Sequence, residues 1–337
     1  MKKPAFKKIG VIGGGSWGTT LASLLAEIHG RALLWARGED LCEKINRAHE
    51  NPVYLPGFKL PRGLEATTEI ERAVSGAEIL VFVVPSQYAR GVLERMAPFV
   101  SPETVLVSAT KGIENKTLKT MAELFRECLP HHPPAHQACL SGPSFAKEVM
   151  RKMPTAVTAA CHEPKTAQRI QQAFSSPMFR VYTNPDITGV ELAGALKNVT
   201  AIAAGVSDGM GFGHNTRATL ITRGLAEMVR LGTALGANPS TFYGLAGVGD
   251  LILTCTGDLS RNRTVGVRLG KGETLLGILD EMKMVAEGVK TTKSAHDLAR
   301  KYGIEMPIVE QVYLLLYKDK DARTCVKDLM LRTLKAE

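Results

Sequence analysis

Lys197 is the residue of this chain best suited to move a proton. It lies in a segment of small and apolar residues, Val190–Val199, and Gly194 and Ala201 share its helix face at spacings of three and four. Small neighbours let another surface approach the amine and remove its water. Desolvation lowers the pKa of a lysine toward neutrality, where proton transfer is efficient. The segment therefore predicts an acid–base lysine; the alternative is a lysine that reaches solvent from a buried helix.

A second chemical signal is a glycine-rich loop, Gly13-x-Gly15-x-x-Gly18, between an apolar run and a helical stretch. Gly13 allows a tight turn, Gly15 lets a pyrophosphate approach the backbone, and Gly18 lets the helix pack against the strand. The helix start then presents free N–H groups to the phosphates. The loop predicts a dinucleotide site, with an ordinary glycine-rich turn as the alternative.

The residue at the end of the second predicted strand bears on the choice of nucleotide. An acidic residue there would bind the ribose hydroxyls of NAD, but the strand ends in Trp35-Ala36-Arg37. A guanidinium can clamp a 2′-phosphate or stack on adenine. Arg37 therefore predicts that NADP is accepted and leaves NAD open, unless it is simply a solvated surface charge.

Polar residues at two further places could bind a substrate. Asp250 follows a glycine-rich turn, and Ser260-Arg261-Asn262 has the form of a helix start capped by Ser260, which suits a phosphate. Taken alone, that segment is more typical of a capped, exposed helix. Lys111 follows a predicted parallel strand, where side chains point into the ligand crevice.

The elements that must position these residues change character near residue 185. Before it, short apolar runs alternate with helical stretches, which indicates parallel strand pairing and a doubly wound sheet. After it, helical patterns dominate. We expect an α/β fold: a Rossmann-like, doubly wound, mostly parallel sheet over 1–189, the dinucleotide-binding domain, followed by an all-helical substrate-binding and catalytic domain over 190–337. The expected strands are 8–12, 32–36, 79–84, 104–108, 137–140, 156–160 and 180–182.

Composition excludes several classes of protein. The 337 residues include 45% hydrophobic and 22% charged residues, an ordinary globular composition. The net charge of +9 is spread along the chain without a basic stripe, so we expect a small anionic substrate and a dinucleotide but no nucleic acid. We expect no membrane span, no signal peptide and no metal site. The six cysteines form no CxxC pair and predict reduced thiols of a cytoplasmic protein.

Assembled in order, these segments resemble the NAD(P)-dependent glycerol-3-phosphate dehydrogenase family of bacterial type. The resemblance covers almost the whole chain. The matching segments are residues 13–19, 51–57, 109–112, 141–148, 195–199, 215–218, 247–251, 254–256, 260–263 and 285–288.

The resemblance implies roles for particular residues. Lys197 would be the proton donor and acceptor. The implied substrate contacts are Lys111, Gly142, Ser144, Lys197, Asp250, Ser260, Arg261 and Asn262. The implied cofactor contacts are Ser16, Trp17, Arg37, Lys111, Ala146, Arg261, Val285 and Glu287, with Tyr54 as a weaker candidate beside the loop glycines Gly13, Gly15 and Gly18.

These roles lead to an expected reaction. Hydride would pass between NAD(P)H and C2 of dihydroxyacetone phosphate to give sn-glycerol 3-phosphate, a phospholipid precursor, with Lys197 moving the proton. The substrate would enter between the two domains, and the family implies a homodimer. Two alternatives stay open: another two-domain hydroxy-acid or sugar-acid dehydrogenase, and a dinucleotide-binding sensor without turnover.

Overall fold

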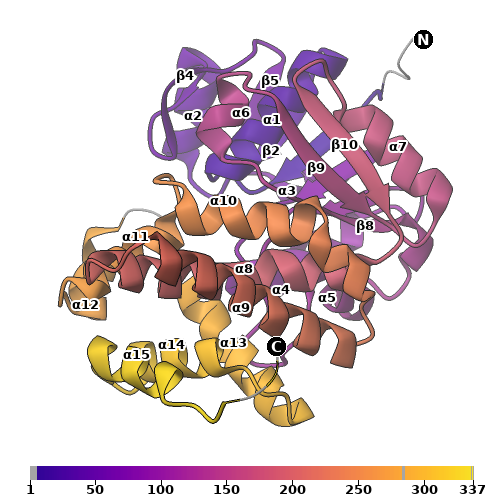
Figure 1. The fold of residues 1–337 in the computed structure, drawn as a ribbon. Coiled ribbons are helices and arrows are strands. Elements are labelled where there is room, and N and C mark those ends of the chain that lie inside the picture. The colour runs from indigo at the N-terminus through magenta and orange to yellow at the C-terminus, as the bar shows by residue number, and fades with distance from the viewer. Residues whose placement is uncertain (1–5, 283–284, 335, 337) are drawn as a thin grey trace. The chain divides into compact units, whose positions relative to one another are not determined.

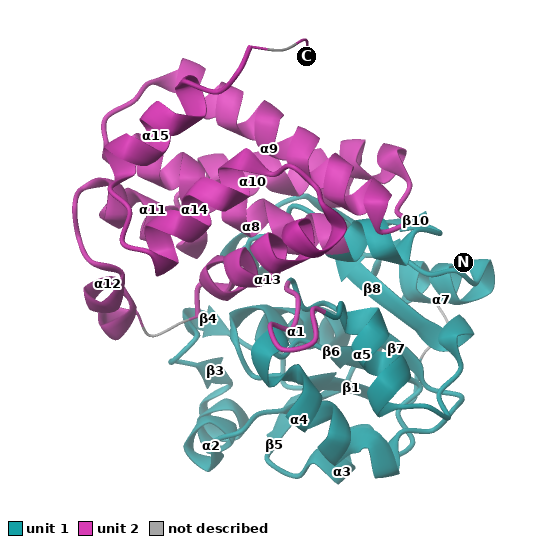
Figure 2. Ribbon diagram, turned by 90° about the horizontal axis from the view of Figure 1, so that it is seen from below, with its two compact units in different colours: residues 1–111, 119–191 teal, residues 112–118, 192–337 magenta. Residues whose placement is uncertain are grey.

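The structure, a computed structural model, describes residues 6–282, 285–334 and 336. The chain forms two compact units, coloured separately in Figure 2: residues 1–111 and 119–191 make unit 1, and residues 112–118 and 192–337 make unit 2. Residues 112–118 belong to unit 2 because Ile113 lies in its hydrophobic core and accepts a hydrogen bond from Ser294 Oγ at 3.2 Å.

Unit 1 is built on an eight-stranded sheet, shown with its helices in Figure 1. Its strand order is β10-β9-β8-β7-β6-β1-β2-β5. The chain moves outward from β1 to β2 and β5 and then returns to β6 on the other side of β1, so the sheet has its topological switch point at the end of β1. The strands are β1 (Ile9–Ile12), β2 (Ala32–Trp35), β5 (Leu64–Thr67), β6 (Ile79–Phe82), β7 (Val105–Ser108), β8 (Gln137–Ser141), β9 (Thr155–Ala160) and β10 (Phe179–Asn184).

The continuous apolar runs of the central strands arise because helices cover both faces of the sheet. In β6, Ile79 and Val81 lie in one hydrophobic core, and Leu80 and Phe82 lie in the other. Alternate residues of a strand point to opposite faces, so a strand buried on both sides has no polar positions. The helices of unit 1 are α1 (Ser16–His29), α2 (Glu39–Ala48), α3 (Ile70–Val74), α4 (Ser86–Met96), α5 (Met121–Cys128), α6 (Ala146–Met150) and α7 (Pro164–Phe174).

The seven expected strands are all present, with ends that differ by one or two residues. The sheet is mostly parallel, as expected. Strands β8 and β9 pair antiparallel, whereas the other pairs of this sheet are parallel. The short β3 (Glu50–Asn51) and β4 (Leu55–Lys59), which form an antiparallel pair, and the edge strand β5 were not expected. Their sequences are short and carry charged, Pro and Gly residues, so hydrophobic periodicity does not mark them.

Unit 2 is helical, as expected. Apart from residues 112–118, it starts within α8 (Ile187–Gly209), a helix that is buried along most of its length. This explains why apolar and small residues dominate its sequence, since a helix enclosed on most sides has no exposed polar face. The following helices are α9 (His214–Ala234), α10 (Asp250–Thr256), α11 (Arg261–Gly270), α12 (Leu275–Glu281), α13 (Glu287–Tyr302), α14 (Pro307–Tyr317) and α15 (Ala322–Met330).

Two features of unit 2 differ from expectation. The segment expected to be a glycine-rich turn before Asp250 is a wide helical turn, Leu245–Gly249, which leads directly into α10. The sequence pattern predicts a helix over residues 291–302, and helix α13 begins four residues earlier, at Glu287. In the described part of the chain, no helix has the length and apolar character needed to cross a membrane.

Candidate functional site

One candidate site is the loop between β1 and α1 in unit 1. Gly13 has φ of 126°, and a Cβ there would lie 2.6 Å from the Val83 carbonyl oxygen, so only glycine fits this turn. A Cβ on Gly18 would lie 1.8 Å from the Gly13 carbonyl oxygen, which shows how closely helix and strand pack. Around Gly15 a Cβ would meet nothing within 4 Å. The loop therefore leaves open space above its middle glycine, at the switch point of the sheet.

Asn51 holds this loop in place, and the sequence analysis gave it no role. Its buried side-chain amide donates to the Gly14 carbonyl at 3.0 Å and to Thr19 Oγ1 at 2.8 Å. Its side-chain oxygen accepts from the Tyr54 backbone N–H at 3.0 Å, and Ser16 Oγ donates to the Tyr54 carbonyl at 2.5 Å. The loop and the turn at Tyr54 are thus tied together. Hydrophobic periodicity gives no signal for Asn51, because its side-chain nitrogen bonds to Gly14 and Thr19, which lie more than 30 residues earlier in the sequence.

The residues present fit a dinucleotide. Helix α1 starts at Ser16 without a side-chain cap, so its first N–H groups suit a phosphate. The neighbouring Trp17 Nε1 is buried without an acceptor among the described residues. Arg37 is exposed directly after β2, with no acidic residue at the strand end.

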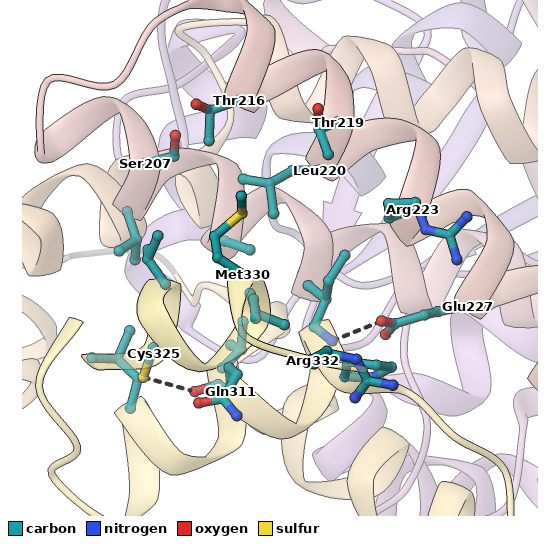
Figure 3. Close-up of a pocket in the computed structure, with 18 of the residues that line it drawn as sticks. Ser207, Thr216, Thr219, Leu220, Arg223, Glu227, Gln311, Cys325, Met330 and Arg332 are labelled. Atoms are coloured by element: carbon teal, nitrogen blue, oxygen red, sulfur yellow. Dashed lines mark hydrogen bonds between the residues drawn. The ribbon is translucent and has the colours of Figure 1, made fainter. Parts of the chain in front are cut away.

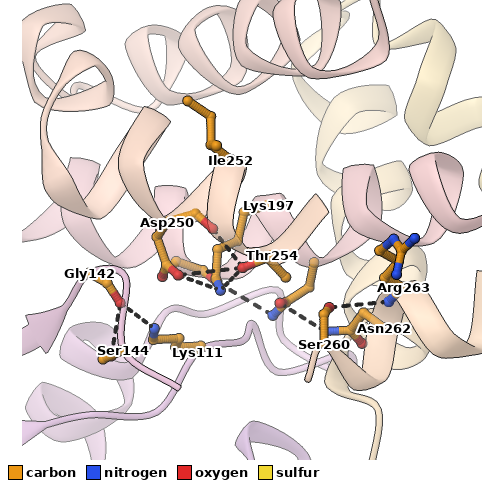
Figure 4. A network of polar contacts seen from close by, with 12 residues as sticks. Lys111, Gly142, Ser144, Lys197, Asp250, Ile252, Thr254, Ser260, Asn262 and Arg263 are labelled. Carbon is orange, nitrogen blue, oxygen red and sulfur yellow. Dashed lines mark hydrogen bonds and ion pairs between the residues drawn. The ribbon is translucent and has the colours of Figure 1, made fainter. Parts of the chain in front are cut away.

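In unit 1, the polar side chains that follow β7 and β8 donate hydrogen bonds to the backbone carbonyl of Gly142, as Figure 4 shows. Its carbonyl accepts from Lys111 Nζ at 3.1 Å and from Ser144 Oγ at 2.9 Å. Gly142 has φ of 145°, and a Cβ would lie 2.9 Å from the Val157 Cα, so no larger residue fits. Ala146 begins α6 four residues later and is half-buried.

A separate candidate site lies in unit 2 and centres on Lys197. Its Nζ lies 2.9 Å from Asp250 Oδ1 and donates to Thr254 Oγ1 at 2.6 Å, and all three side chains are buried (Figure 4). Asp250 and Thr254 are one turn apart on α10, so a single short helix carries both partners of the amine. A buried ammonium is costly unless it is paired, and Asp250 supplies that pair.

Thr254 was quoted in the sequence motif but given no role. Its hydroxyl donates to the Asp250 backbone carbonyl at 2.6 Å, which leaves its oxygen oriented to accept from Lys197. Two oxygen atoms, Asp250 Oδ1 and Thr254 Oγ1, therefore fix the orientation of the amine. The i, i+4 spacing of Asp250 and Thr254 could have signalled this, had the helix been expected to start at Asp250.

The predicted helix start at Ser260 is present in unit 2. Ser260 Oγ accepts from the Arg263 backbone N–H at 3.2 Å and caps α11, and Arg261 stands exposed at the first helical position. The side chain of Asn262 is instead buried and bonded within the unit. Val285 is exposed, and Glu287 opens α13 and interacts electrostatically with Arg261.

The doubly wound sheet with its glycine loop, and the helical unit with its buried amine on a carboxylate, define a dinucleotide-binding protein of the two-unit dehydrogenase class. Two family models match the chain: the N-terminus of NAD-dependent glycerol-3-phosphate dehydrogenase over residues 8–167 and its C-terminus over residues 186–327. The chain therefore belongs to the NAD-dependent glycerol-3-phosphate dehydrogenase family.

Individual relatives agree with this membership. A glycerol-3-phosphate dehydrogenase [NAD(P)+] from a Geobacter species is 58% identical over 331 residues, which cover 98% of this chain and 99% of that protein. The protein of the same name from Geobacter sulfurreducens is 57% identical with the same coverage. The crystal structure of glycerol-3-phosphate dehydrogenase from Coxiella burnetii has a TM-score of 0.93 at 38% identity and covers 98% of this chain and 100% of that one.

Proposed function

We propose that this chain catalyses the reversible, NAD(P)-dependent reduction of dihydroxyacetone phosphate at C2 to sn-glycerol 3-phosphate. In this reaction Lys197 is the proton donor and acceptor. The observation that carries the proposal is the buried contact of Lys197 Nζ with Asp250 and Thr254, within a chain of this family. The product serves phospholipid synthesis. Membership of this family does not favour the two alternatives, a different two-domain dehydrogenase and a dinucleotide-binding sensor without turnover.

The chemistry divides between cofactor and chain. Bound NAD(P)H supplies the hydride to C2. Protonated Lys197 gives a proton to the oxygen that becomes an alkoxide, and in the reverse direction neutral Lys197 accepts the hydroxyl proton. Asp250 stabilises the ammonium while it is charged, and Thr254 directs it. A group held in place before the reaction needs little reorganisation when charge develops, which lowers the barrier.

Substrate binding is assigned to residues of both units. In unit 2, the start of α11 would bind the phosphate through helix N–H groups and the guanidinium of Arg261. The substrate contacts that we propose are Lys111, Gly142, Ser144, Lys197, Asp250, Ser260, Arg261 and Asn262. The cofactor contacts that we propose are Gly13, Gly15, Ser16, Trp17, Gly18, Arg37, Tyr54, Lys111, Ala146, Arg261, Val285 and Glu287. Residues 1–189 and 190–337 then act as the dinucleotide-binding and substrate domains.

A direct assay tests the function. The purified chain is mixed with NADPH, and the reduced-nicotinamide absorbance is followed with and without dihydroxyacetone phosphate. We expect rapid loss of absorbance only with the phosphate ester. Glyoxylate, pyruvate and a keto sugar acid serve as the matched panel. Turnover of one of these in preference to dihydroxyacetone phosphate would favour another dehydrogenase, and binding of NADPH without any turnover would favour a sensor.

We propose that the protein is a cytoplasmic homodimer. In unit 2, a cavity of about 500 Å³ lies among α8, α9, α14 and α15, and its lining is mainly apolar (Figure 3). Leu220 and Met330 line it, and Met330, Leu331 and Leu334 beside it are 76%, 71% and 95% exposed. Exposed apolar patches of this kind mark interfaces. Light scattering after gel filtration should give twice the chain mass, and Leu220→Arg should shift it toward the monomer; a monomeric parent protein would refute the dimer.

A further inference from the structure

The side chain of Asn262 is hydrogen-bonded at both its nitrogen and its oxygen inside unit 2. Its Nδ2 donates to Asn198 Oδ1 at 2.9 Å, and its Oδ1 accepts from the Gly288 backbone N–H at 2.9 Å. Asn262 and Asn198 are only 8% and 4% exposed. The three residues stand on α11, α8 and α13, so one amide connects three helices.

The donor and the acceptor of each of these hydrogen bonds can be assigned from the atoms involved. The Gly288 N–H can only donate, so the atom facing it must be the oxygen of Asn262. The amide nitrogen of Asn262 then faces Asn198, which must present its own oxygen, and Asn198 Nδ2 points to the Gly194 carbonyl at 3.4 Å. Each amide has one orientation that satisfies its partners.

Gly288 has no room for a side chain. A Cβ at this position would lie 2.7 Å from Asn262 Oδ1 and 2.8 Å from the Asn198 carbonyl oxygen. The backbone at the start of α13 thus rests directly on the two asparagines. Glu287, the residue before it, and Val285 are the cofactor contacts proposed above for this part of the chain.

We propose that Asn262 is a positioning residue whose side chain holds the start of α13 against α8, and that position 262 contacts substrate only through its backbone N–H. This inference rests on the proposed function and assigns the Asn262 side chain a different part in it. Asn198 follows Lys197 directly on α8. The hydrogen bonds among Asn198, Asn262 and Gly288 therefore fix the position of the segment proposed to contact the cofactor relative to Lys197, the proposed proton donor.

The test compares single and double variants. Asn262→Ala and Asn198→Leu each remove the hydrogen bond between the two asparagine side chains. Asn198→Asp keeps an acceptor for Asn262 Nδ2. Asn215→Ala, at an exposed position of α9, is the control. For Asn262→Ala and Asn198→Leu we expect the Kd of NADPH to rise about tenfold, equal to about 1.4 kcal/mol. Asn215→Ala should stay within about twofold of the parent protein. Asn198→Asp keeps the acceptor for Asn262 but loses the donor to the Gly194 carbonyl, so it should weaken NADPH binding less than Asn198→Leu does. The double variant should be no worse than either single variant, because both remove one linkage.

Two readouts separate positioning from substrate binding. The KM of dihydroxyacetone phosphate should change less than the Kd of NADPH, and hydrogen exchange at the peptide containing Gly288 should accelerate in both Asn262→Ala and Asn198→Leu. A KM increase confined to Asn262→Ala, with unchanged NADPH binding and exchange, would overturn the inference and make its side chain a substrate ligand. Loss of thermal stability with unchanged NADPH binding would reduce Asn262 to a structural role and also overturn it.

Two cases need a separate interpretation: a variant that does not fold, and a parent protein that lacks the proposed activity. If Asn262→Ala does not fold, Asn262→Asp retains the acceptor for Gly288 but loses the Nδ2 donor, and it should weaken NADPH binding less than Asn198→Leu does. Unchanged NADPH binding in Asn262→Asp, together with an increased KM, would again contradict the inference. If the parent protein binds NADPH but does not reduce dihydroxyacetone phosphate, the proposed function fails, while the exchange and binding measurements still decide the role of Asn262.

Discussion

Asp208, near the end of α8, accepts a hydrogen bond from Arg263 Nε of α11 at 2.8 Å. Its other carboxylate oxygen accepts from Arg217 Nε at 2.9 Å. Arg263 lies two residues after Arg261, in the first turn of the helix assigned to the substrate phosphate. The carboxylate therefore links the end of the lysine-bearing helix to the start of α11, for which we propose phosphate binding.

Asp208→Asn should loosen that start without removing any group that touches substrate. We expect the KM of dihydroxyacetone phosphate to rise about tenfold, equal to about 1.4 kcal/mol, with a smaller change in kcat. Steady-state kinetics measure it. Asp258→Asn is the matched control, because Asp258 also binds Arg263, at 2.9 Å, but its side chain is 95% exposed. Equal effects of the two variants would contradict a positioning role for Asp208.

Lys197→Met removes the proton donor but keeps the length of the side chain. General acid–base groups contribute about 10²–10⁴ in rate, so kcat/KM should fall by about a thousandfold. The Kd of NADPH, measured by nicotinamide fluorescence, should stay unchanged. Lys290→Met, at an exposed position of α13, is the control. Turnover by Lys197→Met at the parent rate would remove Lys197 from the mechanism.

Arg37→Ala tests the choice of nucleotide. The guanidinium follows β2 where an acidic residue would favour NAD, so its removal should weaken NADPH more than NADH. A hydrogen bond to a charged group contributes about 1.5–3 kcal/mol, which predicts at least a tenfold rise in the KM of NADPH. The control is Arg31→Ala, also exposed. A similar loss with both nucleotides would show that Arg37 does not read the 2′-phosphate.

The raised pKa of Glu227 predicts that the free energy of unfolding depends on pH. Burial raises the pKa of Glu227 to about 7, although its carboxylate accepts from the backbone N–H groups of Ile308 and Val309 at 2.7 and 3.2 Å. Because the folded-state pKa lies above the ordinary glutamate pKa of 4.5, the stabilising contribution is complete below about pH 4.5 and is lost as pH rises through 7. Relative to Glu227→Gln, the parent protein should lose about 3 kcal/mol of unfolding free energy between pH 5 and 8. Urea unfolding of both proteins measures this difference, and a pH-independent difference would contradict it.

Gly266→Ala tests the close crossing of α8 and α11. A Cβ on Gly266 would lie 2.1 Å from the Ile202 carbonyl oxygen and 2.8 Å from the Val206 backbone nitrogen, so the helices must separate. Overpacking of this kind costs about 1–3 kcal/mol of unfolding free energy. Gly91→Ala in α4 is the control, since its Cβ would meet nothing within 4 Å and should stabilise the helix by about 0.5–1 kcal/mol. Urea unfolding should give opposite signs for the two variants.

Most of the fold could be predicted because its signals are local. The apolar run Ile79–Val84 and the loop Gly13–Gly18 each depend on neighbours in sequence, and both lie where expected. The antiparallel β8–β9 pair could not be predicted, since strand direction is decided by how the chain returns to the sheet and not by the residues of either strand. At the start of α13, the Gly288 N–H likewise donates to the side chain of Asn262, 26 residues earlier, a contact that no local pattern indicates.

Residue types and short spacings were enough to indicate a phosphate loop, a capped helix start and a lysine among small residues. Only the folded chain decided which atoms these groups meet: Asp250 and Thr254 lie 53 and 57 residues from Lys197, and Asn262 turns inward to Asn198 and Gly288. Backbone preference acts over a few residues, whereas the partner of a buried polar group is determined by the packing of distant helices that exclude water around it.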